Sequence, residues 1–133
     1  MPMGRFVFYN SNPAGKRVGD CVARAMSRAV GVSWISAYVE LCVMGFMHSD
    51  MPTANNVWGA YLRSKGFRRY PVEDTGDIYT VADFCRDHPR GVYVLALDGH
   101  VVAVEDGDWY DTWDSGDGVP IYYWMREDNA NGK

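Results

Sequence analysis

The sequence has few of the residues from which disulfide frameworks and metal sites are built. Its 133 residues include three cysteines and three histidines, and the cysteines follow no regular spacing. This pattern does not predict a disulfide framework, so we expect a protein of a reducing compartment. Neither CxxC nor HxxxH occurs, and Cys85 and His88 have no second ligand pair beside them. We therefore predict no metal and no cofactor, and we interpret Cys85 as a structural residue.

Long apolar runs and an excess of positive charge are also missing. Residues 1–10 lack the apolar core of a signal peptide, and the longest apolar stretch, residues 34–47, contains Glu40 and is too short to span a bilayer. The 17 acidic residues outnumber the 13 basic ones, which gives a formal net charge of −4. This charge argues against general binding to nucleic acid or to an acidic membrane. We expect a cytoplasmic protein with neither of these as a partner.

The composition supplies enough apolar material for one folded core. Hydrophobic residues make up 47% of the chain and aromatic residues 14%. We predict a single domain over residues 1–127 and a flexible tail at 128–133. A few basic residues form a cluster in the middle of the chain: Arg63, Lys65, Arg68 and Arg69. We interpret this basic cluster as the solvated end of a helix.

Helical spacing dominates the first two thirds of the sequence. It predicts helices at residues 20–30, 34–47, 53–65 and 80–88. Gly31 fits a left-handed C-cap, Ser33 fits an N-cap, and Thr80 with Asp83 forms a capping-box pattern. The second helix is expected to turn one apolar face, with Cys42 on it, toward the core: Ile35, Tyr38, Val39, Cys42 and Phe46.

From Gly91 onward the pattern changes to the alternation that is typical of strands. Strands are predicted at residues 92–97, 100–105, 108–112 and 119–125, with Asp-Gly turns after the first two. These strands form an antiparallel meander, and residues 5–9 add a possible edge strand. The fold class is therefore α+β, with N-terminal helices packed on a C-terminal antiparallel sheet of about four to five strands.

Three residues on these elements fit a thiol-based active site. Cys21 begins the first predicted helix, where the helix macrodipole favours the thiolate. His100 begins a strand, and Asp111 lies on the next strand, from which a carboxylate can hold the imidazole in one tautomer and raise its basicity. Each residue alone also fits a structural role, but together they supply a nucleophile, a base and an orienting carboxylate.

The segments Gly19-Asp20-Cys21, His100-Val101-Val102 and Asp111-Thr112-Trp113 resemble the papain-like cysteine peptidases. That family places Cys at a helix start, then His on a strand, then Asn or Asp followed two residues later by Trp. The resemblance implies a papain-like fold and a catalytic triad of Cys21, His100 and Asp111. It also implies that Trp113 shields the His–Asp pair from water, although core packing explains a Trp there equally well.

Two other positions bear on this site. Papain-like enzymes usually place a Gln six residues before the nucleophile, and here that position is Gly15. Asn12 is our substitute oxyanion donor, together with the Cys21 backbone N–H. The alternative is that Asn12 only forms the turn before Pro13. Asp114 is the rival third member of the triad.

The residues and the resemblance together predict a cysteine peptidase or amidase that cleaves a peptide or isopeptide bond through a thioester acyl-enzyme. The chain is shorter than a typical papain-like peptidase and resembles compact papain-fold proteins of bacteria and their phages. Those include peptidases, amidases and acyl or peptidyl transferases, and the fold alone does not choose among them. A transferase and a non-catalytic binding module both stay open. The expected partner is a peptide or protein substrate, and no oligomeric state is predicted.

Overall fold

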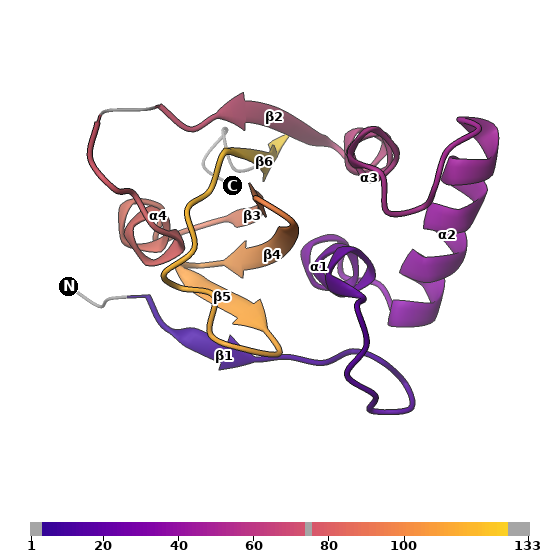
Figure 1. Ribbon diagram of the computed structural model, residues 1–133, viewed down its shortest axis with the longest axis horizontal. Coiled ribbons are helices and arrows are strands. Elements are labelled where there is room, and N and C mark those ends of the chain that lie inside the picture. Colours follow the sequence, from indigo (N-terminus) through magenta and orange to yellow (C-terminus); the bar gives the residue numbers. More distant parts are fainter. Residues whose placement is uncertain (1–3, 74–75, 128–133) are drawn as a thin grey trace.

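The computed structural model describes residues 4–73 and 76–127, and these contain four helices and six strands (Figure 1). The elements in chain order are β1 (Phe6–Phe8), α1 (Cys21–Val30), α2 (Trp34–Met47), α3 (Asn55–Ser64), β2 (Phe67–Pro71), α4 (Val81–Asp87), β3 (Val92–Leu97), β4 (His100–Glu105), β5 (Asp108–Asp111) and β6 (Tyr122–Arg126). The predicted α+β class is confirmed. The tail predicted at 128–133 lies outside the described residues.

The strands form one mixed sheet in the order β1-β5-β4-β3-β6-β2. β1 pairs with β5 in parallel, and all other neighbours are antiparallel. The prediction of a purely antiparallel sheet of four to five strands was therefore wrong in strand number and direction. The expected meander holds for β3, β4 and β5, but β6 pairs with β3 on its other side. β6 also starts three residues later than predicted, after Pro120, which has no N–H for a sheet ladder.

β2 was not predicted, and it changes the interpretation of the basic cluster. Phe67 on this strand is buried, whereas Arg68 and Arg69 are exposed. Two adjacent arginines hide the alternation that marks a half-buried strand. Arg68 and Arg69 thus lie on a sheet edge and not at the end of a helix.

Local capping chemistry places the helix ends where the sequence predicted them. Gly31 has φ of 83° and its N–H donates to the Ser27 carbonyl, which ends α1. The Ser33 hydroxyl accepts from the Ser36 N–H at the start of α2. Thr80 and Asp83 make both bonds of a capping box at α4.

Helices cover both faces of the sheet (Figure 1). On one face α1 and α3 pack on the sheet around buried residues such as Met26, Trp58 and Trp124. On the other face α4 buries Phe84 and Cys85 against the sheet. Cys85 is 1% exposed, in agreement with its interpretation as a structural residue. α1 therefore lies directly on β4, and this contact brings the start of α1 close to the start of β4.

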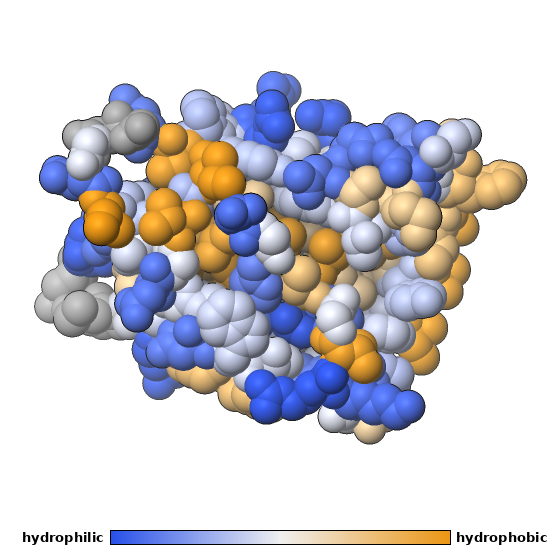
Figure 2. Space-filling model, in the orientation of Figure 1, coloured by the Kyte–Doolittle hydropathy of each residue, from blue (hydrophilic) through white to orange (hydrophobic). Residues whose placement is uncertain are grey.

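α2 packs on α1 and α3 in an outer layer, and its orientation was predicted wrongly. Its buried residues are Ala37, Leu41 and Gly45, whereas the face expected in the core, Cys42 included, is exposed. A Cβ at position 45 would lie 2.8 Å from the Asp50 carbonyl oxygen, so close packing selects the face with small residues. Because α2 is apolar on most of its sides, periodicity alone could not choose that face. Figure 2 shows the resulting apolar surface at the right edge, where α2 lies in Figure 1.

Within residues 4–73 and 76–127, no single helix is long and apolar enough to cross a membrane. α1 and α2 pass such a test together by length and composition, but they are bent by 111° at their break. Most of α1 is buried inside the fold.

Candidate active site

Cys21 is the first residue of α1, and it lies half-buried at a cleft. Asp20, the residue before it, makes no side-chain cap on the helix. The first backbone N–H groups of α1 therefore have no capping carboxylate among the described residues, and the positive end of the helix acts on the thiol. The predicted position of Cys21 at a helix start is thus the observed one.

His100 is the first residue of β4 and faces a buried carboxylate. Its Nε2 lies 2.6 Å from Oδ2 of Asp111, the last residue of β5. The Asp111 side chain is 1% exposed, whereas the His100 side chain is 14% exposed. Because Nε2 is engaged by Asp111, Nδ1 is the ring nitrogen left to act on another group.

Asp111 is held as a carboxylate by several donors. Ser115 Oγ donates to Oδ2 at 2.7 Å, and the Thr112 N–H and Arg24 Nη2 donate to Oδ1 at 2.8 and 3.0 Å. Burial alone would raise the pKa of Asp111, but the hydrogen bonds from His100 and Ser115 and the charge of His100 lower it below the usual value. The orienting group therefore keeps its negative charge.

Cys21 and His100 shift each other's pKa in opposite directions. Burial would raise the pKa of the thiol, but its hydrogen bond with His100, a backbone hydrogen bond at Val101 and the charge of His100 bring it below the usual value. Burial would lower the pKa of His100, but Asp111 and Cys21 raise it to about 9. These opposite shifts favour a thiolate beside an imidazolium.

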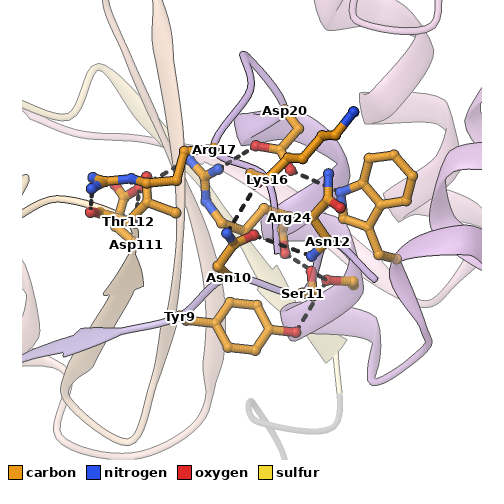
Figure 3. A network of polar contacts seen from close by, with 12 residues as sticks. Tyr9, Asn10, Ser11, Asn12, Lys16, Arg17, Asp20, Arg24, Asp111 and Thr112 are labelled. Atoms are coloured by element: carbon orange, nitrogen blue, oxygen red, sulfur yellow. Dashed lines mark hydrogen bonds and ion pairs between the residues drawn. The ribbon is translucent and has the colours of Figure 1, made fainter. Parts of the chain in front are cut away.

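Arg24 connects the two halves of this site and was missed by the sequence analysis (Figure 3). It lies one turn after Cys21, is 4% exposed, and forms ion pairs with both Asp20 and Asp111. Trp34 Nε1 donates to the other oxygen of Asp20 at 2.8 Å. The spacing of Asp20 and Arg24 could have suggested their contact, but nothing local predicts a partner 87 residues away.

The structure does not bring Asn12, the predicted oxyanion donor, to the cleft. Asn12 Oδ1 accepts from the Ala14 N–H at 2.8 Å and its own N–H donates to Asn10 Oδ1 at 3.1 Å, so the residue builds a turn (Figure 3). Asn12 is not among the residues that line the cleft. Asn-Pro-Ala-Gly is a strong turn sequence, and this local chemistry prevails. Thr53 and Asn55 do line the cleft, and each carries a side-chain donor.

Trp113 and Asp114 take different places around His100. The ring centroids of Trp113 and His100 are 4.8 Å apart, so the indole covers one side of the imidazole, although it is itself half exposed. Asp114 accepts from Trp109 Nε1 and from the Gly116 N–H, both at 2.9 Å. Asp111 is therefore the partner of His100, and Asp114 stabilises the loop after β5.

The thiol and the imidazole open onto a cleft of about 430 Å³, a size suited to a small ligand or a few residues of a peptide. The cleft is bounded by α1, by the turn between β3 and β4, by the start of α3 and by the start of β6. Its lining includes Thr53, Asn55, Trp58, Leu97, Ile121 and Tyr122. In the part of the chain that the structure describes, no group of three His, Cys, Asp or Glu residues is arranged to hold a metal.

Comparisons of the chain with protein-family models, with curated proteins and with solved structures found no match. The function is therefore argued from the residues of the site. Beside an open cleft, a thiol at a helix start lies next to an imidazole. The imidazole in turn contacts a buried carboxylate. This arrangement can activate a thiol as a nucleophile and return a proton to a leaving group.

Proposed function

We propose that the protein is a papain-like cysteine hydrolase that cleaves a peptide or other amide bond through a thioester intermediate. The observation that carries the proposal is the placement of Cys21 and His100 on one cleft, with the imidazole of His100 held by the buried Asp111. The order of Cys, His, Asp and Trp along the chain, and a nucleophile on a helix packed against the sheet that holds the base, support a papain-like fold.

In this mechanism the Cys21 thiolate attacks the carbonyl carbon of the scissile bond. The carbonyl oxygen becomes an oxyanion, which the Cys21 backbone N–H stabilises at the start of α1. As the C–N bond breaks, the His100 imidazolium gives its proton to the departing amine and leaves an acyl group on the sulfur. His100 then takes a proton from water, the water oxygen attacks the thioester, and the carboxylic acid and the thiol are released.

Asp111 keeps its charge throughout these steps. Its contact with Nε2 holds Nδ1 toward the thiol and stabilises the imidazolium form of His100. Trp113 covers part of the imidazole, and this keeps water from competing for the His–Asp hydrogen bond.

Thiol alkylation tests the proposal, because the chain contains its own reference thiols. Cys42 is exposed with no catalytic partner, whereas Cys85 is buried and its pKa is raised to about 12. At pH 6 we expect iodoacetamide to modify Cys21 at least about tenfold faster than Cys42, and Cys85 not at all. The His100→Ala variant should lose the advantage of Cys21. Equal rates at Cys21 and Cys42 in the wild type would refute an activated thiol.

Turnover is tested by incubating a complex peptide mixture with the wild type and with Cys21→Ala. We expect new peptide termini only with the wild type, and mass spectrometry of the quenched protein should detect an acyl adduct on Cys21. An activated Cys21 without new termini or adducts would exclude peptide hydrolysis.

A further inference from the structure

A second cavity lies next to the cleft. This cavity, of about 420 Å³, shares Asn55 and Tyr122 with the cleft. It extends along α3 and β2 to two arginines, Arg63 and Arg69, and to Trp124. The second cavity is therefore adjacent to the cleft that holds Cys21.

The aromatic residues of β6 and α3 form a common floor for both cavities. Tyr122 and Trp124 lie two residues apart on β6, and Trp58 of α3 lies against both, with ring centroids 6.3 and 6.4 Å away. Trp124 is buried, and its Nε1 has no hydrogen-bond partner among the described residues. The two cavities are thus lined by one cluster of packed aromatic rings.

The two arginines of the second cavity differ from the rest of the basic cluster. Lys65 pairs with Glu40 and Arg68 pairs with Glu127, each at 3.0 Å. Within residues 4–73 and 76–127, no carboxylate lies within ion-pair distance of Arg63 or Arg69.

These unpaired guanidinium groups lie on aromatic rings instead. The Arg63 guanidinium lies 5.2 Å from the ring centroid of Trp124, and that of Arg69 lies 5.0 Å from the ring centroid of Tyr122. Arg69 also makes a side-chain hydrogen bond with Tyr122. Contact with a ring restricts a guanidinium, and its five N–H donors are more than one such bond uses.

We propose that this second cavity is a substrate subsite that binds a carboxylate group of the peptide. Arginine binds carboxylates with paired N–H donors, and no Asp or Glu lines the cavity. Asn55 and Asn56 add further side-chain donors at its rim. The carboxylate comes from an acidic side chain or from the free C-terminus of the substrate. This inference rests on the proposed hydrolase, because it assigns the substrate class of that same site.

The test compares two double variants on a mixture of peptides. Arg63→Gln with Arg69→Gln removes the proposed ligands, and Lys65→Gln with Arg68→Gln removes the same charge from ion-paired positions of the same cluster. We expect wild type and control to prefer peptides with a carboxylate at a fixed distance from the scissile bond. For a preferred peptide, the arginine variant should raise KM at least about tenfold with kcat within about twofold, since two charge-assisted bonds are lost. C-terminally amidated peptides separate the two sources of the carboxylate.

The result that overturns the subsite is cleavage without any carboxylate preference, or an equal loss in both double variants. Absence of cleavage by the wild type is a failure of the hydrolase and not of the subsite. The subsite is then tested by binding: Cys21→Ala protein should retain carboxylate-bearing peptides from the mixture, and adding the two arginine substitutions should abolish retention. Retention that does not depend on the arginines would also refute it.

A separate observation concerns the outer face of α2, which we define as Ile35, Tyr38, Val39, Val43, Phe46 and Met47. These side chains are 51% to 85% exposed, and Figure 2 shows apolar surface gathered at this edge. At ordinary side-chain areas they expose roughly 700 Å², close to the about 800 Å² that each partner contributes to a standard interface. Isolated monomers seldom expose so large a contiguous apolar patch.

The geometry points to a second copy of this chain as the occupant of the outer face. In an antiparallel pair of α2 helices with a two-fold axis between residues 40 and 41, Ile35 lies opposite Phe46 and Tyr38 opposite Val43 of the second copy. Every residue of the outer face then meets an apolar position, as an isologous interface requires. α2 contains no Lys or Arg, whereas helices that lie on membranes carry basic residues along their polar face.

Sedimentation over a range of concentrations tests this dimer. We expect a monomer–dimer equilibrium whose Kd rises at least about tenfold in Phe46→Glu and less than twofold in Ile78→Glu, because Ile78 is equally exposed but distant from α2 in sequence. Circular dichroism checks that both variants fold. A monomer at all concentrations, or equal effects of the two substitutions, would overturn the dimer, as would vesicle binding through Phe46 by a monomer.

Cys42 allows a test of the antiparallel register in a Cys21→Ala background. Three residues of axial offset, a helix separation of 8 to 10 Å and Cα atoms that face the partner at a radius of about 2.3 Å place the two Cys42 Cα atoms roughly 6 to 8 Å apart. A short bis-maleimide should therefore link the two copies through Cys42. Linking that persists after Phe46→Glu is added would refute the register.

Discussion

Replacing Asp111 by Asn tests the electrostatic reasoning behind the site. The pKa of His100 is raised from 6.5 to about 9 by Asp111 and Cys21 against the opposing effect of burial. At about 1.4 kcal/mol per pKa unit, this shift corresponds to about 3 kcal/mol of preference for the imidazolium in the folded protein. Asn keeps the shape of the side chain but removes its charge, so most of that preference should disappear.

The measurement is an NMR titration of the histidine ring protons. In Asp111→Asn we expect the pKa of His100 to fall by roughly two units, and the pKa of Cys21 to rise because its cationic neighbour is lost. Alkylation of Cys21 at pH 6 should slow accordingly. Asp114→Asn is the matched control, since Asp114 lies three residues away and contacts Trp109 instead.

A double variant with Cys21→Ala divides the effect between the two neighbours of His100. We expect a larger change in the pKa of His100 from Asp111→Asn than from Cys21→Ala, because the hydrogen bond to Asp111 is the largest of the effects that raise this pKa. A His100 pKa that moves by less than half a unit in Asp111→Asn, or that moves equally in Asp114→Asn, would show that this account of the site is wrong.

Three further predictions concern stability. Arg24→Met leaves two buried carboxylates without their shared partner, and urea unfolding should show a loss of about 3 to 5 kcal/mol; a loss below about 1 kcal/mol would contradict the buried network. In Cys21→Ala protein, Asp111 still raises the pKa of His100, so this group stabilises the fold fully below pH 6.5 and progressively less as pH rises above that value. Adding His100→Ala should remove this pH dependence, and parallel curves for the two proteins would refute it. Gly45→Ala should lower the unfolding free energy by about 1 to 3 kcal/mol despite better helix propensity, because its Cβ meets the Asp50 backbone; a stabilised variant would show that the loop can shift.

The parts of the fold that were predictable are those decided by neighbouring residues. Gly31, Ser33 and the Thr80–Asp83 pair set helix ends through contacts within a few residues, and the structure has each of them. Asn12 is another local case, since its side chain accepts from the Ala14 N–H and forms a turn. Its predicted oxyanion role had been inferred from its position before Cys21. Such local interactions can be predicted from a sequence because the interacting residues are close together along the chain.

The parts that were missed depend on contacts that the chain makes only after it has folded. Arg24 needs Asp111 from the far end of the chain, and β2 needs β6 beside it before its two arginines can be recognised as edge residues. The orientation of α2 depends on the helices against which it packs. For a helix that is apolar on most of its sides, the sequence pattern does not predict which face is buried. In the site itself, the positions of Cys21 and His100 at element starts were predictable, whereas the buried support behind them was not.

The parallel pairing of β1 with β5 has a consequence for how the protein is made. The Tyr9 N–H donates to the Asp111 carbonyl, so the first strand is fixed by one of the last. At about 5 to 20 residues per second, a ribosome needs roughly 5 to 20 s to proceed from Cys21 to Asp111. During that interval the nascent thiol has neither His100 nor its carboxylate and keeps an ordinary pKa. The thiol therefore gains both neighbours that lower its pKa only after Asp111 has been made and β5 has paired with β4.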